Sequence, residues 1–565
     1  MDNRAHFRSY DIDEFDNIFP LHNKTNFSEV SAAKIKETNE YVVLKKYALD
    51  FGNKKFDKNT SIIDCIPREI YLNKYLTENT DVTVDMKGIC IDQKKKEIYL
   101  ILERGGISLY NYINENDYTS SDIKRIFYEG LQLIFKLHCH CIMHSDIKVE
   151  NFIFKNNELK IIDFGLADLL HICPAHSIIG EYLCTVYTKA PEKRKNFETD
   201  IYSFGITMVH VITKAYYQPN VKYDGNKITI ERDDKIYDET YFVEKIGKDG
   251  YNLLCNMLTV DNTMRISAYD ALQHPYFNDI KNTNLNLLHS QYDPKYCKIN
   301  YCLSKLSFYK TKNHAEISHE DDKKIVKRLV NGYYCYNKNE YINNIHELKF
   351  RKIHHTIFSP KIIKCNDKIA QSMYDESIET IFKNLSVFAN GVDPLLNAMI
   401  MFRCMQISDQ KTADYTLAVL LRLFDGIINC YGHLSFDEIY ETTRYANENA
   451  LRNVYYKSLE QLLTCDMYLF MPILSYYNMK LLHETNILSN DDDINKFKLK
   501  LYEILINTVM NLNIDGMTVD IIVKYCMMLS LCYVFQIGVS DYIRDPLVSF
   551  VILDKTTVNK LTTLK

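Results

Sequence analysis

The sequence of 565 residues contains no tryptophan and little glycine or proline, with 17 and 11 residues of each. Lysine, asparagine, isoleucine and tyrosine are plentiful instead, a bias that is compatible with an AT-rich genome and carries no information about mechanism. No basic segment followed by an apolar run opens the chain, so we predict no secretory signal. The longest uncharged run, residues 525–540, is too short to cross a bilayer, so it predicts a buried helix and no membrane partner.

Two further deficits exclude other classes of protein. The formal net charge of −5 lacks the basic balance of a nucleic-acid binder, so we expect no nucleic-acid partner. The 16 cysteines are scattered without paired spacing, which is typical of reduced thiols and not of a disulfide framework. With 46% hydrophobic and 25% charged residues, the composition predicts a soluble, intracellular, globular protein. The length predicts two to four domains.

Hydrophobic periodicity predicts a mixed α/β first half and an all-α second half. The expected segments are, in order, a polar tail (1–20), a β-rich lobe (21–103) with strands at 34–47 and 97–103 and a helix at 62–76, a mainly helical lobe (104–280), a linker with a helix near 319–333 (281–370), and two helical units (371–478 and 479–565).

Three short motifs follow one another in the first half. HSDIKVEN (144–151) precedes IIDFGLAD (161–168), and KAPE (189–192) comes after both. This order and spacing resemble the catalytic loop, the magnesium motif and the end of the activation segment of protein kinases. The resemblance implies a bilobal protein-kinase fold that transfers the γ-phosphate of ATP to serine or threonine hydroxyls of a protein substrate, with Mg²⁺ as cofactor.

The residue types in these motifs suit phosphoryl transfer, which depends on positioning and electrostatic stabilisation. Asp146 is expected to orient the substrate hydroxyl and accept its proton. Lys148 is expected to neutralise charge on the transferring phosphoryl group. Asn151 and Asp163 offer oxygen ligands of the kind that Mg²⁺ prefers.

The same resemblance implies the remaining site residues. Lys45, in the VVLK strand, is expected to hold the α- and β-phosphates, and Glu69 to form the ion pair that keeps Lys45 in place. Further ATP contacts are implied for Asn23, Ser28, Val30, Val43, Leu102, Glu103 and Gly105. Supporting roles are implied for Thr185, which would contact Asp146 and Lys148, for Asp200, which would anchor the catalytic loop, and for a buried ion pair between Glu192 and Arg265.

Within the protein kinases, residues 21–280 resemble the cyclin-dependent kinases. KETNEYVVLKKY (36–47) is similar to their third-strand region, and IPREIYLNKYL (66–76) to the PSTAIRE helix that a cyclin positions. The glycines of their nucleotide-covering loop are replaced here by Asn23, Thr25 and Ser28. Because glycines let backbone N–H groups approach phosphates closely, this loss supports an alternative interpretation as a pseudokinase scaffold.

A second departure concerns control by phosphorylation. In cyclin-dependent kinases, three arginines grip a phosphothreonine of the activation segment. Arg68 matches one of them, but Ser145 and Asp168 stand at the other two positions and Gly180 at the phosphoacceptor position. A phosphate without its arginines gains few charge-assisted hydrogen bonds. We therefore hypothesise activation without activation-loop phosphorylation, with Asp168 paired to Arg68 and Ser177 as a nearby alternative acceptor.

Residues 371–478 resemble a cyclin box. The expected helices lie at 375–389, 393–407, 412–429, 436–446 and 448–472, and further helices at 495–512 and 518–537 would belong to a second unit. A kinase fused to its own cyclin-like activator resembles proteins of giant DNA viruses, which would place it in the host cytoplasm or nucleus. The linker has a root-mean-square span of roughly 50 Å, so the activator is expected to reach the kinase N-lobe in cis or in trans. The alternatives are a generic helical domain and one that recruits substrates without activating the kinase.

Overall fold

The computed structural model describes residues 7–21, 28–48, 62–139, 142–169, 185–192, 197–214, 220–224, 227–232, 235–262, 264–280, 410–428, 448–464 and 519–536, with a few single residues between 398 and 504. The chain divides into two compact units, drawn mainly from its N-terminal and its C-terminal half.

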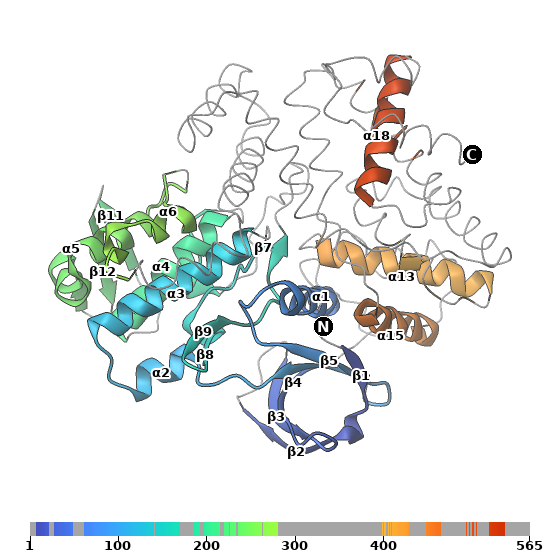
Figure 1. Ribbon diagram of the computed structural model, residues 1–565, viewed down its shortest axis with the longest axis horizontal. Helices are drawn as coiled ribbons and strands as arrows, with labels where there is room; N and C mark the ends of the chain where they lie inside the picture. The colour runs from blue at the N-terminus through green and yellow to red at the C-terminus, as the bar shows by residue number, and fades with distance from the viewer. Residues whose placement is uncertain are drawn as a thin grey trace. The chain divides into compact units, whose positions relative to one another are not determined.

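The first unit begins with a six-stranded sheet in the spatial order β1-β5-β6-β4-β3-β2, which curls around its own core (Figure 1). β1 runs parallel to β5, and the other neighbours are antiparallel. The strands are β1 (Arg8–Tyr10), β2 (Phe15–Pro20), β3 (Glu29–Ile35), β4 (Tyr41–Ala48), β5 (Met86–Asp92) and β6 (Glu97–Glu103). Every strand contributes to one buried cluster, formed by Tyr10, Phe15, Ala33, Ile35, Val42, Leu44, Cys90, Tyr99 and Ile101.

The structure corrects the tail predicted for residues 1–20. From Arg8 onward this segment forms β1, the 3-10 helix η1 (Ile12–Glu14) and β2. The reason is that Tyr10 and Phe15 enter the core of the sheet, where each is less than a tenth exposed. Gly88 makes room for β1, because a Cβ there would lie 1.9 Å from the carbonyl oxygen of Arg8.

The strand and helix predicted between 62 and 103 are confirmed as β6 and α1 (Ile62–Asn79). The apolar run at 34–47 is not one strand, because it contains the end of β3, a turn and β4. Asn39 closes the turn with a φ of 61°, a left-handed conformation that asparagine adopts more readily than most residues.

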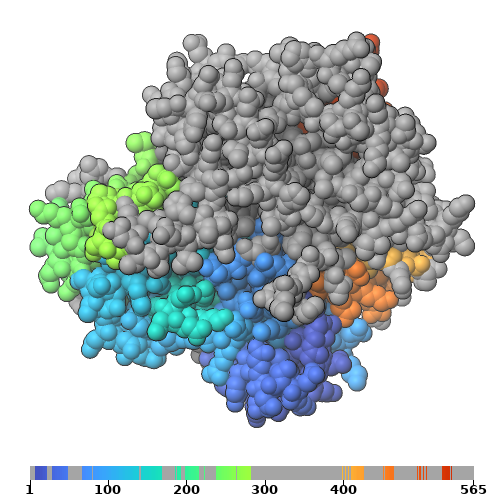
Figure 2. Space-filling model, viewed as in Figure 1, coloured from blue at the N-terminus to red at the C-terminus, as the bar shows by residue number. Residues whose placement is uncertain are grey.

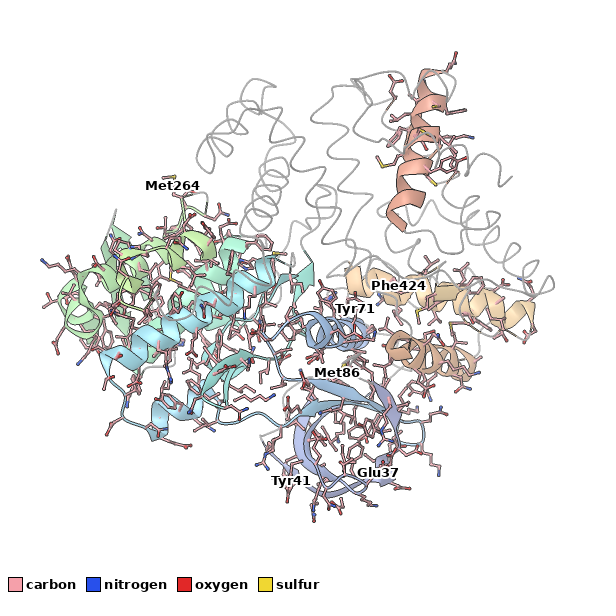
Figure 3. The ribbon with its side chains drawn as sticks, viewed as in Figure 1. Glu37, Tyr41, Tyr71, Met86, Met264 and Phe424 are labelled. Carbon is pink, nitrogen blue, oxygen red and sulfur yellow. The ribbon has the colours of Figure 1, made fainter. Side chains whose placement is uncertain are left out.

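The second lobe of this unit is mainly helical, as predicted. Its helices are α2 (Leu109–Glu115), α3 (Ser120–Cys139), α4 (Phe197–Thr213), α5 (Glu239–Met257) and α6 (Ala268–Leu272), with the 3-10 turn η5 (Pro275–Phe277). α3 and α4 pack closely because Gly130 has no side chain, and a Cβ there would lie 2.2 Å from the ring of Phe204. Side chains fill the interior of the lobe, while Met264, in the loop before α6, is exposed (Figure 3). In the space-filling view the sheet residues are blue and those of the helical lobe cyan to green (Figure 2).

Four short strands frame the catalytic loop in this lobe. They pair as β7 (Ile142–Met143) with β10 (Asp168–Leu169), and β8 (Phe152–Lys155) with β9 (Glu158–Ile161). A three-stranded antiparallel sheet, β11 (Asn220–Asp224), β12 (Lys227–Arg232) and β13 (Lys235–Tyr237), was not predicted. The alternation in KITIER (227–232) is the β signal that the mostly helical interpretation missed.

The second unit contains α13 (Gln410–Ile428), α15 (Glu448–Thr464) and α18 (Val519–Phe535), of which α13 packs against α15. These helices confirm those predicted at 412–429 and 518–537 and the first two thirds of the one at 448–472. The predicted helices at 319–333, 375–389 and 436–446 lie outside the described residues. Among the helices that the structure describes, none combines the length and apolarity needed to cross a bilayer.

Candidate active site

The loop that carries Asp146 is held in place by Asp200 at the start of α4. The buried Asp200 carboxylate accepts the backbone N–H groups of His144 and Ser145, each at 2.8 Å, and lies 3.1 Å from Nε2 of His138. Burial alone would raise the pKa of Asp200, but the hydrogen bond and charge of His138 lower it below its usual value. A buried carboxylate with three donors is stable as an anion, so Asp200 fixes the position of the loop.

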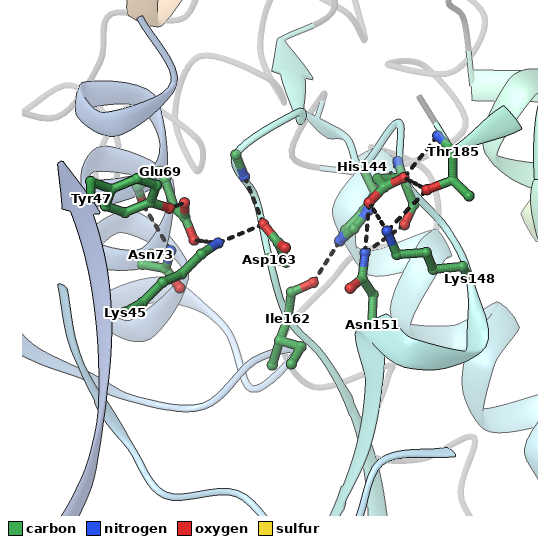
Figure 4. Close-up of polar contacts among 12 residues, drawn as sticks. Lys45, Tyr47, Glu69, Asn73, His144, Lys148, Asn151, Ile162, Asp163 and Thr185 are labelled. Carbon is green, nitrogen blue, oxygen red and sulfur yellow. Dashed lines mark hydrogen bonds and ion pairs between the residues drawn. The ribbon is translucent and has the colours of Figure 1, made fainter. Parts of the chain in front are cut away.

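The Asp146 carboxylate is surrounded by donors from two segments, which include Lys148, Asn151 and Thr185, all labelled in Figure 4. Oδ1 accepts the hydroxyl of Thr185 at 2.6 Å and its backbone N–H at 3.1 Å. Oδ2 accepts Nζ of Lys148 at 2.7 Å and Nδ2 of Asn151 at 3.0 Å. Lys148 also donates to Oγ1 of Thr185 at 2.9 Å. The structure therefore brings together Asp146 and Lys148, predicted as catalytic, with Thr185, predicted to contact both. Asn151, predicted as a magnesium ligand, lies in the same cluster.

His144 connects this loop to the strand end that carries Asp163. Its Nε2 lies 3.0 Å from the carbonyl oxygen of Ile162, and its Nδ1 lies 3.3 Å from the backbone N of Asp146. Because a carbonyl only accepts, Nε2 carries the proton and Nδ1 accepts. Burial lowers the pKa of His144, which favours this neutral form. His144 thus ties the loop of Asp146 to the strand end that precedes Asp163.

A second cluster joins the two lobes around Lys45 (Figure 4). Nζ of Lys45, in β4, donates to Oε1 of Glu69 in α1 at 2.7 Å and to Oδ1 of Asp163 at 2.8 Å. The hydroxyl of Tyr47 hydrogen-bonds to the other oxygen of Glu69, Oε2. Asn73, one turn further along α1, donates its Nδ2 to the backbone oxygen of Glu69 at 2.8 Å. Lys45 and Glu69 therefore pair, as the sequence analysis expected of them.

The charges of this cluster stabilise one another. Burial would lower the pKa of Lys45, but the carboxylates of Asp163 and Glu69 raise it well above its usual value. Burial would raise the pKa of Asp163, but the Lys45 ammonium holds it at about 2. Burial raises the pKa of Glu69, and Lys45 only partly offsets this effect. Lys45 and Asp163 are therefore charged at neutral pH. Glu69 depends on the hydrogen bonds from Lys45 and Tyr47 to remain ionised.

Asn151 and Asp163 fit a magnesium ion by the chemistry of their donor atoms. Nδ2 of Asn151 donates to the backbone oxygen of Asp146 at 2.8 Å and to its Oδ2 at 3.0 Å. The amide carbonyl oxygen of Asn151 is therefore the atom that could bind a metal ion. Lys45 contacts Oδ1 of Asp163, and the Asp163 side chain remains 41% exposed. Two hard oxygen donors, of which Asp163 keeps access to solvent while Asn151 is buried, suit Mg²⁺, which retains several of its waters.

Several of the predicted ATP contacts share one face of the sheet. Val30 lies directly opposite Lys45 across β3 and β4, and Val43 lies opposite Leu102 across β4 and β6. Directly opposed residues, and residues two apart on a strand, point to the same face. Val30, Val43 and Leu102 thus form an apolar surface beside the Lys45 ammonium, which suits a nucleotide base next to its phosphates.

The other predicted ATP contacts are placed differently. Oε2 of Glu103 accepts Nζ of Lys155 at 2.6 Å, which ties the end of β6 to β8. Gly105 lies against Ile153, and a Cβ at Gly105 would be 2.2 Å from its Cδ1. Ser28 directly precedes β3, whereas Asn23 lies outside the described residues.

The activation-segment predictions fall largely outside the described residues. Arg68 is buried in α1, and Ser145 lies in the catalytic loop with a φ of 64°. The backbone of Asp168 pairs with Met143 in β10 and β7, but its side chain is not among those described, nor are Ser177 and Gly180. The proposed pairing of Arg68 with Asp168 therefore stays a prediction.

The ion pair between Glu192 and Arg265 is bidentate. Nη1 and Nη2 of Arg265 donate to Oε1 and Oε2 of Glu192 at 2.6 and 3.0 Å. Arg265 also donates to the backbone oxygens of Thr259 and Glu198, at 2.9 and 2.6 Å. These bonds fix the KAPE segment to the helical lobe.

Sequence reasoning missed four side chains of the site: Tyr47, Asn73, His138 and His144. Tyr47 follows Lys45 by two residues, so strand periodicity places both on one face. Asn73 follows Glu69 by four residues, which is one helical turn. These spacings were the available signals. For His138 no comparable signal exists, because its contact with Asp200 joins residues 62 positions apart.

Comparison with known proteins agrees with this geometry. Residues 24–277 match the family described as protein kinase domain. The chain is 29% identical over 225 residues to serine/threonine-protein kinase ppk6 of Schizosaccharomyces pombe, an alignment that covers 38% of this chain and 27% of that protein. It is 26% identical over 309 residues to cyclin-dependent kinase G-2 of Oryza sativa, with 48% and 42% of the two chains covered. The chain thus matches less than half the length of these curated relatives. Residues 24–277 are thus similar to a protein kinase domain, and the described part of this range has one lobe built on a sheet and one mainly helical lobe.

Proposed function

We propose that the chain is an active Ser/Thr protein kinase that transfers the γ-phosphate of ATP to hydroxyl groups of a protein substrate. The observation that carries this proposal is the double contact of Lys45, which bonds Glu69 at 2.7 Å and Asp163 at 2.8 Å. This arrangement holds a phosphate-binding cation next to a metal-binding carboxylate. Both parts must be in place together for phosphoryl transfer in a protein kinase.

The residues around Asp146 supply the other half of the reaction. Asp146 accepts the proton of the substrate hydroxyl and orients its oxygen towards the γ-phosphate. Lys148 neutralises charge that develops on the transferring group, and Thr185 fixes both side chains. Mg²⁺, held by Asn151 and Asp163, would neutralise and orient the phosphates of ATP.

The substitution Asp146→Asn tests the proposal. General-base catalysis contributes about 10²- to 10⁴-fold in rate, so kcat should fall in that range while Mg²⁺-dependent ATP binding persists. The measurement is transfer of labelled phosphate from ATP to a generic basic protein. Equal transfer by the wild type and by Asp146→Asn would contradict the proposal.

The pseudokinase scaffold remains a second candidate, because Asn23, Thr25 and Ser28 replace the glycines of the nucleotide-covering loop. Side chains at these positions would keep the backbone N–H groups from the phosphates. A wild-type chain that binds ATP and Mg²⁺ but transfers no phosphate to any acceptor would favour the scaffold.

For control of the enzyme, we infer that the helical C-terminal half acts as a cyclin-like activator of the N-lobe, in cis or in trans, without activation-loop phosphorylation. Three features support this inference: the PSTAIRE-like sequence at 66–76, the loss of arginine at Ser145 and Asp168, and the likeness to a relative named as a cyclin-dependent kinase. A tether raises the effective concentration of a weak partner to about the millimolar range.

The test compares the full chain with residues 1–285, alone and with residues 286–565 added in trans. We expect low activity for the truncated chain and recovery on addition, with circular dichroism to show that each fragment folds. Full activity of folded residues 1–285 alone would instead favour a helical domain that recruits substrates.

A further inference from the structure

Tyr47 is a buried hydroxyl that the mechanism above does not use. It lies in β4 two residues after Lys45, so the two side chains share one face of the strand. Tyr47 is 4% exposed, and its hydroxyl bonds Oε2 of Glu69. Lys45 takes the other oxygen of the same carboxylate, at 2.7 Å. The Glu69 carboxylate is therefore bound at both oxygens by side chains of a single strand.

This second donor matters because Glu69 is almost completely buried, at 1% exposure. A carboxylate with one unpaired oxygen in such a place is costly, since a buried acceptor without a donor loses its hydration without replacement. Burial also raises the pKa of Tyr47, and the nearby Glu69 raises it further. The phenol thus stays protonated and remains a donor at neutral pH.

The two donors also restrict where α1 can lie. A single lysine on a flexible stem follows its carboxylate over a range of positions. The hydroxyl of Tyr47 has a narrower range of positions, because the phenol ring is rigid and is buried here. With both donors in β4 and the acceptor in α1, the sheet fixes the carboxylate plane. Glu69 in turn fixes Nζ of Lys45 at 2.8 Å from Asp163.

We propose that Tyr47 is a positioning residue that, through Glu69, holds Lys45 in the geometry for the ATP phosphates. This inference rests on the proposed function, since it takes Lys45 as the phosphate ligand. It also adds to the account of control, because a fixed phenol stabilises the paired arrangement of Lys45 and Glu69 without any phosphorylated residue.

The test uses the full chain with Tyr47→Phe, which keeps the ring and removes only the hydroxyl. A hydrogen bond to a charged group corresponds to about tenfold or more in an equilibrium constant. We therefore expect the Kd for ATP with Mg²⁺, measured by calorimetry, and the KM for ATP to rise by about tenfold. The KM for the protein substrate should stay within about twofold, because Asp146 and Thr185 are not touched.

Tyr99→Phe is the matched control. Tyr99 lies in β6 of the same sheet, and its hydroxyl bonds Oε2 of Glu97 at 2.5 Å. The Tyr99→Phe variant also loses a hydrogen bond from a tyrosine to a carboxylate, but that carboxylate is not the partner of Lys45. Its Kd for ATP should therefore equal that of the wild type. An equal loss of ATP affinity in both variants would overturn the proposal, because it would show a general effect on the sheet.

A double-mutant cycle separates positioning from packing. In a Glu69→Gln background, Tyr47→Phe should change the Kd for ATP by less than about twofold, since the carboxylate that it orients is gone. A full additional tenfold loss there would overturn the proposal. If the wild type binds ATP but transfers no phosphate, the proposed kinase activity fails, while the Kd comparison still decides the role of Tyr47. A wild type that binds no ATP would overturn both.

Discussion

The hydroxyl of Thr185 donates to Oδ1 of Asp146 at 2.6 Å and accepts from Nζ of Lys148 at 2.9 Å. This contact joins the end of the activation segment to the catalytic loop. The orientation of Asp146, the proposed general base, therefore depends on the segment that carries Thr185. A change in that segment would be transmitted directly to Asp146.

Replacement of this threonine should slow catalysis. Thr185→Val keeps the shape but removes the hydroxyl bonds to Asp146 and Lys148, each of which involves a charged group. We expect kcat to fall about tenfold to a hundredfold, with the KM for ATP nearly unchanged. Thr207→Val is the control, because its hydroxyl bonds only the backbone oxygen of Ser203 at 2.8 Å. A loss of kcat in Thr207→Val as large as that in Thr185→Val would contradict this prediction.

The Lys45 cation should act on ATP and not on the protein substrate. Lys45→Met removes the charge that lies between Glu69 and Asp163 and leaves Glu69 buried without a countercharge. We expect the KM for ATP to rise and kcat to fall, together at least about a hundredfold in kcat/KM. The KM for the protein substrate should stay near the wild-type value. Steady-state kinetics with each substrate varied in turn provide the measurement.

The ion pair of Glu192 and Arg265 should be important for stability. Arg265→Ala removes a buried cation that donates to Glu192 and to three backbone oxygens, at a cost of about 3–5 kcal/mol. The midpoint of urea unfolding, followed by circular dichroism, measures this loss. Lys124→Ala breaks the pair with Asp279, whose side chain is 63% exposed, and should cost at most about 1 kcal/mol. Similar decreases in the unfolding midpoint of Arg265→Ala and Lys124→Ala would contradict the prediction that the buried pair contributes more to stability than the exposed one.

The N-terminal strand should depend on Gly88. A Cβ there would lie 1.9 Å from the carbonyl oxygen of Arg8, so Gly88→Ala should displace β1 at a cost of about 1–3 kcal/mol. The same substitution in a chain that begins at residue 11 should cost less, because the clashing strand is gone. Equal unfolding midpoint shifts in the two backgrounds would show that β1 is not what the glycine accommodates.

Activity should not require phosphate on the activation segment. Ser177→Ala is expected to keep the wild-type kcat, because two of the three arginine positions that would grip a phosphate are Ser145 and Asp168. Mass spectrometry of the active protein should find Ser177 unmodified. A phosphorylated Ser177 together with an inactive Ser177→Ala variant would refute the hypothesis.

Much of the kinase domain could be predicted from the sequence, because the motif residues lie close together along the chain. HSDIKVEN and IIDFGLAD each place their functional side chains within a few residues, and Arg265 stands in a recognisable final motif. The β11–β13 sheet and the N-terminal strand were missed for a different reason. Both are short segments whose strand character depends on a partner strand as much as on their own pattern.

The sequence alone predicted which residues would carry the proposed phosphoryl transfer, since Lys45, Asp146, Asn151 and Asp163 have the charges and donor atoms that this reaction needs. The tertiary structure decided how they are held. Asp200 meets His144 and His138 only because α4 packs beneath the catalytic loop, and Tyr47 reaches Glu69 only because α1 lies against β4. These contacts join segments that are distant in sequence. Because a buried polar group is stable only when it has a hydrogen-bond partner, each contact favours the one packing that brings its two groups together.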